Sequence, residues 1–137
     1  MTSEFMRDLL SKDEKITVEY KTCQFGIQED VYETVCSFSN RYGGYIIMGA
    51  EDDGTPIGVK QNMVKDMKRN FVNQLNNPDK MSPTLYLSIE DFEYEGKILL
   101  WVYVPPTATV EKCGNRIYDR NEDGDMDITD SPIQLLN

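Results

Sequence analysis

The stretch VCSFSNRYGGYIIMGAEDDGTPIGV, residues 35–59, decides the fold. Its beginning completes a helix predicted over residues 28–40, because apolar side chains recur there at helical spacing. These apolar positions are Val31, Val35 and Phe38. The Gly43-Gly44 pair ends the helix, since glycine accepts the positive φ of a helix C-cap. The apolar run at 45–48 follows at once and predicts a buried central strand.

Outward from this stretch, helical and strand patterns alternate. Toward the N-terminus, residues 16–21 alternate between apolar and polar and predict a strand, preceded by a short amphipathic helix over 3–11. Toward the C-terminus, Asn62 is the expected cap of a helix that ends before Pro78 and buries Met67 and Phe71.

The second half adds strands at 85–92 and 98–104, joined by a tight hairpin turn at 94–97. A further short strand within 110–118 and a last helical turn at 132–136 complete the expected tail. The order α-β-α-β-α-β-β plus a C-terminal tail predicts a single α/β (α+β) domain over residues 1–137. The simplest architecture for this order is two main helices packed on one mixed sheet.

Composition excludes several classes of chemistry. The sequence contains no histidine, so Ser-His-Asp triads and histidine-ligated metals are excluded. Three cysteines without Cys-x-x-Cys spacing favour reduced thiols. With neither a signal peptide nor a membrane span in the pattern, we expect a cytoplasmic protein without membrane contact. The net charge of −10 weighs against non-specific nucleic-acid binding, which basic residues drive.

Three blocks in order resemble one known family. They are Val18-Glu19-Tyr20-Lys21, the segment 35–48 with its Phe-x-Asn and Gly-Gly, and the loop GAEDDGTPIGV at 49–59, followed by a weaker Tyr-x-Arg at 118–120. The chain therefore resembles the Alba-like, Schlafen-type nucleic-acid-binding domain. The resemblance implies an Alba-like fold, a homodimer, and binding of DNA or RNA, often in chains described as transcriptional regulators. The sequence has no Walker A pattern that would support an ATP site.

For nucleic-acid contact, the candidates are basic residues near the glycine pair, on the third helix and in the tail. They are Arg41, Lys65, Lys68, Arg69, Lys112, Arg116 and Arg120. The i, i+3, i+4 spacing of Lys65, Lys68 and Arg69 places them on one face of the third helix. The alternative is an ordinary solvated helix face on a protein-interaction domain that has lost nucleic-acid binding.

A carboxylate set suggests a second function. Glu14, Glu19 and Asp52 fall where some Schlafen relatives carry the carboxylates of an RNA-cleaving site, and Lys21 shares the strand face of Glu19. Such a site would hold magnesium or manganese and make the domain a metal-dependent ribonuclease. The alternative is a surface Glu–Lys pair of little energetic value.

Residues 119–130 match a calcium-loop template in spacing. The expected ligands are Asp119, Asn121, Asp123, Asp127 and Asp130, arranged around Gly124. The last position is Asp where the template has Glu, and a strand is expected just before the loop. The alternative is therefore a polar turn held by its own Asx contacts.

Overall fold

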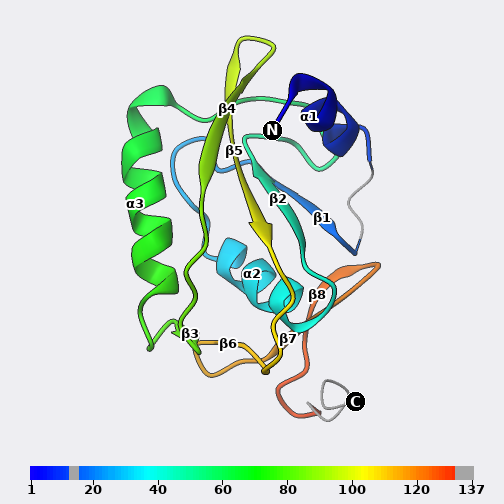
Figure 1. Ribbon diagram of the computed structural model, residues 1–137, viewed down its shortest axis with the longest axis vertical. Coiled ribbons are helices and arrows are strands. Elements are labelled where there is room, and N and C mark those ends of the chain that lie inside the picture. The colour runs from blue at the N-terminus through cyan, green and yellow to red at the C-terminus, as the bar shows by residue number, and fades with distance from the viewer. Residues whose placement is uncertain (13–15, 132–137) are drawn as a thin grey trace.

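A four-stranded mixed sheet forms the centre of the computed structural model, which describes residues 1–12 and 16–131 (Figure 1). Its strands are β1 (Val18–Lys21), β2 (Gly44–Met48), β4 (Glu90–Tyr94) and β5 (Lys97–Val104). They lie in the order β1-β2-β5-β4. β1 runs parallel to β2, whereas β5 is antiparallel to both of its neighbours. The predicted mixed α+β architecture is thus confirmed.

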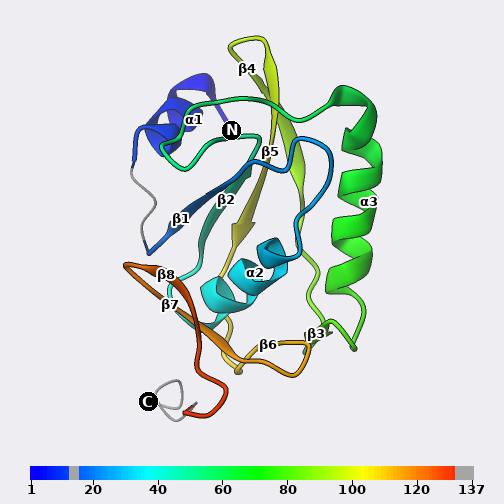
Figure 2. The same cartoon turned by 180° about the vertical axis from the view of Figure 1, so that it is seen from behind.

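Helices cover both faces of this sheet. Helix α1 (Ser3–Leu10) packs on one face, while α2 (Asp30–Asn40) and α3 (Val64–Leu75) lie on the other (Figures 1 and 2). The larger core lies on the α2 and α3 side, where the predicted core residues of the helices are at most 2% exposed. These residues are Val31, Val35, Phe38, Met67 and Phe71. No helix in the described ranges is both long enough and apolar enough to span a membrane.

The glycine pair brings α2, β1 and β2 close together. Gly43 has φ +73° and donates its N–H to the Phe38 carbonyl at 2.9 Å, which closes the end of α2 as predicted. A Cβ on Gly44 would lie 2.6 Å from the Thr17 carbonyl oxygen. The second glycine is therefore required by the approach of neighbouring backbone rather than by a turn.

Two details of the second half differ from expectation. Asn62 does not cap α3: it lies in the 3₁₀ turn η1 (Gln61–Met63), and the helix starts at Val64 without a side-chain cap. The strand predicted at 85–92 begins only at Glu90. Residues 85–89 form an irregular segment whose apolar side chains pack on the core. Its Leu85 N–H donates to the Leu75 carbonyl of α3.

The turn between β4 and β5 is confirmed. Tyr94 faces Lys97 across the hairpin, and Glu95 and Gly96 both have positive φ, at 51° and 75°. Two consecutive positive φ values are the mark of a type I′ turn, whose twist matches that of the flanking strands.

The C-terminal part forms two small sheets. β3 (Met81–Ser82) pairs with β6 (Lys112–Cys113), which confirms a short strand within 110–118. β7 (Tyr118–Asn121) and β8 (Gly124–Asp127) form a hairpin against α2. The helical turn predicted at 132–136 lies outside the described residues.

Asn40, the last residue of α2, ties this tail to the core. Its side-chain amide donates to the carbonyls of Glu111 (2.9 Å) and Tyr118 (2.8 Å), and its oxygen accepts the Glu111 N–H at 2.7 Å. Asn40 thus satisfies three backbone groups that lie more than 70 residues further along the chain.

Candidate nucleic-acid interface

The basic residues predicted to bind nucleic acid are mostly occupied by acidic partners. Arg41 forms a bidentate pair with Asp119, with N–O distances of 2.8 and 2.5 Å, and this hydrogen bonding raises the pKa of the guanidinium. Arg116 pairs with Asp127 at 2.7 Å. Both arginines brace the β7–β8 hairpin, so binding a phosphate would require each to leave its carboxylate.

Arg120 is 3% exposed and lies in the core, contrary to its predicted contact with nucleic acid. Its Nη1 is 3.4 Å from Glu19 and 2.9 Å from Asp125, and its Nη2 donates to the Val18 carbonyl. The guanidinium carbon stands 4.8 Å from the centre of the Phe38 ring. Arg120 therefore joins β1, α2 and the hairpin, and it is shielded from any ligand in solvent.

On α3, the predicted basic face is partly neutralised. Lys68 pairs with Asp91 of β4, and Arg69 pairs with Asp66 one turn earlier at 2.6 Å. Lys65 and Lys112 are exposed, and neither forms a salt bridge within the described residues. Five of the seven predicted basic contacts thus already have acidic partners.

The predicted catalytic residues gather in part. Glu19, Lys21 and Asp52 line one surface hollow of about 250 Å³, together with Asp30. Lys21 is 3.0 Å from Asp30 and 3.6 Å from Glu19. Burial alone would lower the pKa of Lys21, but the hydrogen bond to Asp30 and the nearby carboxylates raise it.

Whether this hollow fits a metal ion can be judged from its carboxylates. Glu19 is already paired with Arg120 and Lys21, so its charge is largely compensated. Within residues 1–12 and 16–131, no three His, Cys, Asp or Glu side chains are grouped to hold a metal ion. Glu14 lies outside the described residues. The described carboxylates of the hollow therefore do not complete a metal site by themselves.

The predicted calcium loop forms the β7–β8 strand pair instead of a loop wrapped around one point. Asp119 pairs with Arg41 and Asp127 with Arg116, while the Asn121 side chain accepts the Asp123 N–H at 2.8 Å. The hydrogen bond from Arg116, followed by those from Thr129, lowers the pKa of Asp127 to about 2. The remaining residue, Asp130, is exposed beyond the hairpin. This arrangement favours the polar-turn alternative.

An aromatic cluster that the sequence analysis did not single out lies on the α1 side of the sheet. We call it the aromatic face: Phe5, Tyr45, Trp101 and Tyr103. The Tyr45 ring centroid is 5.0 Å from Tyr103, 5.6 Å from Phe5 and 6.3 Å from Trp101. Phe5 is 43% and Tyr103 44% exposed, so α1 leaves part of this face open to solvent.

Strand register explains how the aromatic face forms. Tyr45 stands opposite Tyr103, and Ile47 opposite Trp101, so all four point to the α1 side of the sheet. The alternation of Trp101 and Tyr103 in β5 was a readable signal for a shared face. What the sequence did not show was how far α1 would cover it.

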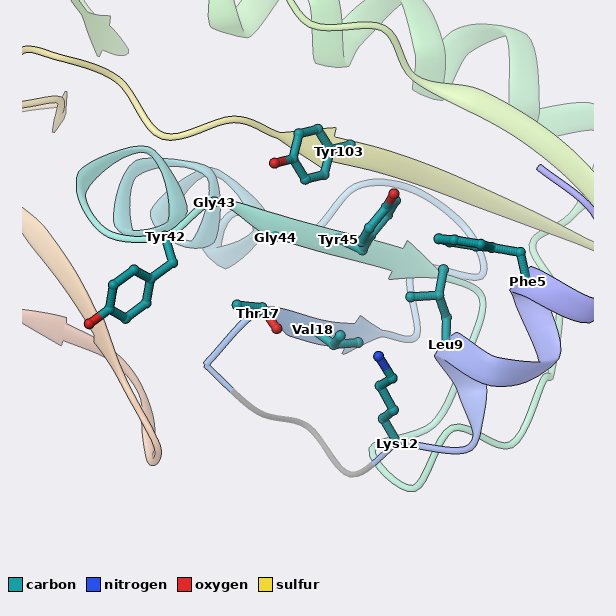
Figure 3. Close-up of a pocket in the computed structure, with 10 residues that line it drawn as sticks. All are labelled: Phe5, Leu9, Lys12, Thr17, Val18, Tyr42, Gly43, Gly44, Tyr45 and Tyr103. Atoms are coloured by element: carbon teal, nitrogen blue, oxygen red, sulfur yellow. The ribbon is translucent and has the colours of Figure 1, made fainter.

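Beside the aromatic face is a pocket of about 230 Å³ (Figure 3). Phe5 and Leu9 of α1 border one side, and the turn around Tyr42 borders the other. The side chain of Lys12 reaches up into this space with its amine toward the sheet (Figure 3). Of the described residues that line the pocket, none is acidic, although the chain has 24 acidic residues.

Comparison with known proteins supports the fold. The family described as Schlafen, AlbA_2 matches residues 14–129. The N-terminal domain of a Nitrosomonas europaea protein described as related to the ATP-dependent DNA helicase RecG is 26% identical, with a TM-score of 0.61 over 76% of this chain and 72% of that chain. The DIP2311 protein of Corynebacterium diphtheriae is 17% identical, with a TM-score of 0.63 over 88% of this chain but only 25% of its own. No curated protein matches the sequence.

Proposed function

Because this chain belongs to the Schlafen, AlbA_2 family, we propose that it is a nucleic-acid-binding domain whose contact surface is the aromatic face. The observation that carries the proposal is the contrast between two surfaces. Five of the seven predicted basic residues are held by acidic partners, whereas the aromatic face is open beside Lys12. Similarity to a helicase-related N-terminal domain is consistent with a role in nucleic-acid transactions.

This surface suits the net charge of the chain. Aromatic side chains bind nucleic acid by stacking on bases, at about 1–3 kcal/mol per base, and this does not need a dense array of cations. Each phosphate neutralised by Lys or Arg contributes roughly 0.7–0.9 to the slope of log affinity against log salt. With one or two cations engaged, we expect a slope near −1 to −2, far shallower than for a strongly basic domain.

The test compares two variants in a salt-titrated binding assay with single- and double-stranded DNA and RNA. Tyr103→Ala removes an exposed ring and should weaken binding about tenfold. The triple variant Lys65→Ala, Lys68→Ala, Arg69→Ala should bind nearly as well as the wild type. Trp101, the single tryptophan of the chain, supplies a fluorescence signal on this face.

The opposite result, in which the triple variant fails and Tyr103→Ala binds normally, would place the interface on α3. No binding to any of the four nucleic acids at low salt would favour the protein-interaction domain considered from the sequence.

A second candidate is a metal-dependent ribonuclease. The observation that favours it is the gathering of Glu19, Lys21 and Asp52 in one hollow. In this candidate Glu19 and Asp52 would hold a divalent metal together with Glu14, and the metal would supply an activated water. Asp52→Asn should then abolish manganese-dependent RNA cleavage, while Asp53→Asn, in the same loop but outside the hollow, should leave it intact. Equal cleavage by both variants, or none by the wild type, would remove this candidate.

A further inference from the structure

The pocket beside the aromatic face is suited to a part of a ligand rather than to a whole one. Its volume of about 230 Å³ is below the roughly 300–1,000 Å³ of pockets that enclose drug-sized ligands. It opens on the same side as the aromatic face. A planar group that enters it would therefore stay joined to a longer molecule lying across the sheet.

The walls of the pocket are aromatic on two sides. Tyr45 and Tyr103 line it from the sheet, with ring centroids 5.0 Å apart, and Phe5 continues this wall from α1. Tyr42, which is 62% exposed, stands at the opposite end (Figure 3). The hydroxyls of Tyr42 and Tyr103 make no side-chain hydrogen bond within the described ranges, so both can bond to polar edges of a ligand.

The charge of the pocket selects the ligand further. Lys12 contributes an exposed ammonium group, and no described lining residue carries a negative charge. Lys12 itself forms no salt bridge within the described part of the chain. In a chain with a net charge of −10, an aromatic pocket whose described lining residues carry one cation and no anion is complementary to a planar group attached to an anion.

We infer that this pocket receives one unpaired nucleobase of a single strand, with the adjoining phosphate on Lys12. The inference rests on the proposed function and adds selectivity to it. A base in a duplex is stacked on both faces and paired along one edge, so it must leave the helix before it can enter the pocket. The domain therefore binds single-stranded nucleic acid, or a strand with an extruded base, in preference to a continuous duplex.

The test uses the full chain and one 12-nucleotide sequence in three forms: a single strand, its blunt duplex, and a single strand whose bases are all replaced by abasic sites. The intact single strand should bind at least about tenfold more tightly than either of the others. A 2-aminopurine in the intact strand should lose fluorescence on binding, because stacking on an aromatic ring quenches it.

Variants assign the effect to the pocket. Tyr103→Phe retains the ring and should keep most of the preference for the single strand, whereas Tyr103→Ala should lose it. Lys12→Met keeps the length of the side chain and should reduce the salt slope by about one, while Lys112→Met, which does not line the pocket, should not.

Two outcomes overturn the inference, and they differ in what they say of the proposed function. If Tyr103→Ala weakens binding but the single strand, the duplex and the abasic strand bind equally, the face binds nucleic acid without taking a base. If no form binds to the wild type, both the inference and the proposed function fail.

Discussion

Glu111 should make the stability of the domain fall as pH rises from about 4.5 to about 7. Glu111 is 1% exposed, and neither of its carboxylate oxygens has a hydrogen-bond partner among the described residues. Burial disfavours the charged form and raises the pKa of Glu111 to about 7. The folded protein therefore holds a proton on this side chain at pH values where the unfolded chain has lost it.

The sign and size follow from proton linkage. Between the unfolded pKa of 4.5 and the folded value of about 7, the native state binds more protons than the unfolded state, so the free energy of unfolding decreases with pH. At about 1.4 kcal/mol per pH unit, ionisation of Glu111 lowers the free energy of unfolding by roughly 3 kcal/mol between pH 4.5 and pH 7. Below pH 4.5 the side chain is neutral in both states and has no effect.

The assay is urea unfolding of the wild type and of Glu111→Gln at pH 5 and pH 8. A glutamine cannot ionise, so its stability relative to the wild type should rise by roughly 2–3 kcal/mol from pH 5 to pH 8. The exposed Glu93→Gln in β4 is the control and should show no such rise. A difference between wild type and Glu111→Gln that stays constant with pH would refute the reasoning.

Three further predictions concern the core and the tail. Phe38→Ala should lower the free energy of unfolding by about 3–5 kcal/mol, because the ring is 0% exposed; a loss below 1 kcal/mol in urea unfolding would contradict its packing. Arg120→Met should cost about 3–5 kcal/mol by leaving Glu19 and Asp125 without their buried partner, and normal stability of this variant would show that the network is dispensable. Millimolar calcium should leave the melting temperature unchanged, since Asp119 and Asp127 are engaged by arginines; a rise that grows with calcium concentration would restore the calcium loop.

Periodicity in the sequence was sufficient for the elements that build the sheet and its helices. The spacing of Val31, Val35 and Phe38 placed α2, and the glycine pair placed its end, because both depend on residues close in the chain. The 85–89 part of the predicted strand was wrong because local spacing does not show hydrogen-bond partners. The alternating apolar residues pack on the core, but the Leu85 N–H bonds to the Leu75 carbonyl of α3 instead of to a neighbouring strand.

The candidate site was harder to predict because charges acquire partners through tertiary contacts. Arg41 and Asp119 are far apart in sequence and adjacent in the fold, and nothing local marks either as paired. The burial of Arg120 and of Glu111 also depends on where the C-terminal hairpin docks. The family resemblance predicted Glu19 and Asp52 as site residues. The exposed aromatic face could not be predicted because it depends on how α1 packs on the sheet. The homodimer and the cytoplasmic location stay predictions.

Arg120 also has a consequence for how molecules of this chain can meet. β1 is an outer strand of the sheet, and the Arg120 guanidinium donates to its Val18 carbonyl at 3.3 Å, so the hairpin occupies the Val18 end of that edge. The other outer strand, β4, carries exposed acidic side chains at Glu90, Asp91 and Glu93, which repel a like strand. Both edges therefore disfavour an added strand, and we expect any homodimer of this domain to join through a face rather than extend one continuous sheet across two molecules.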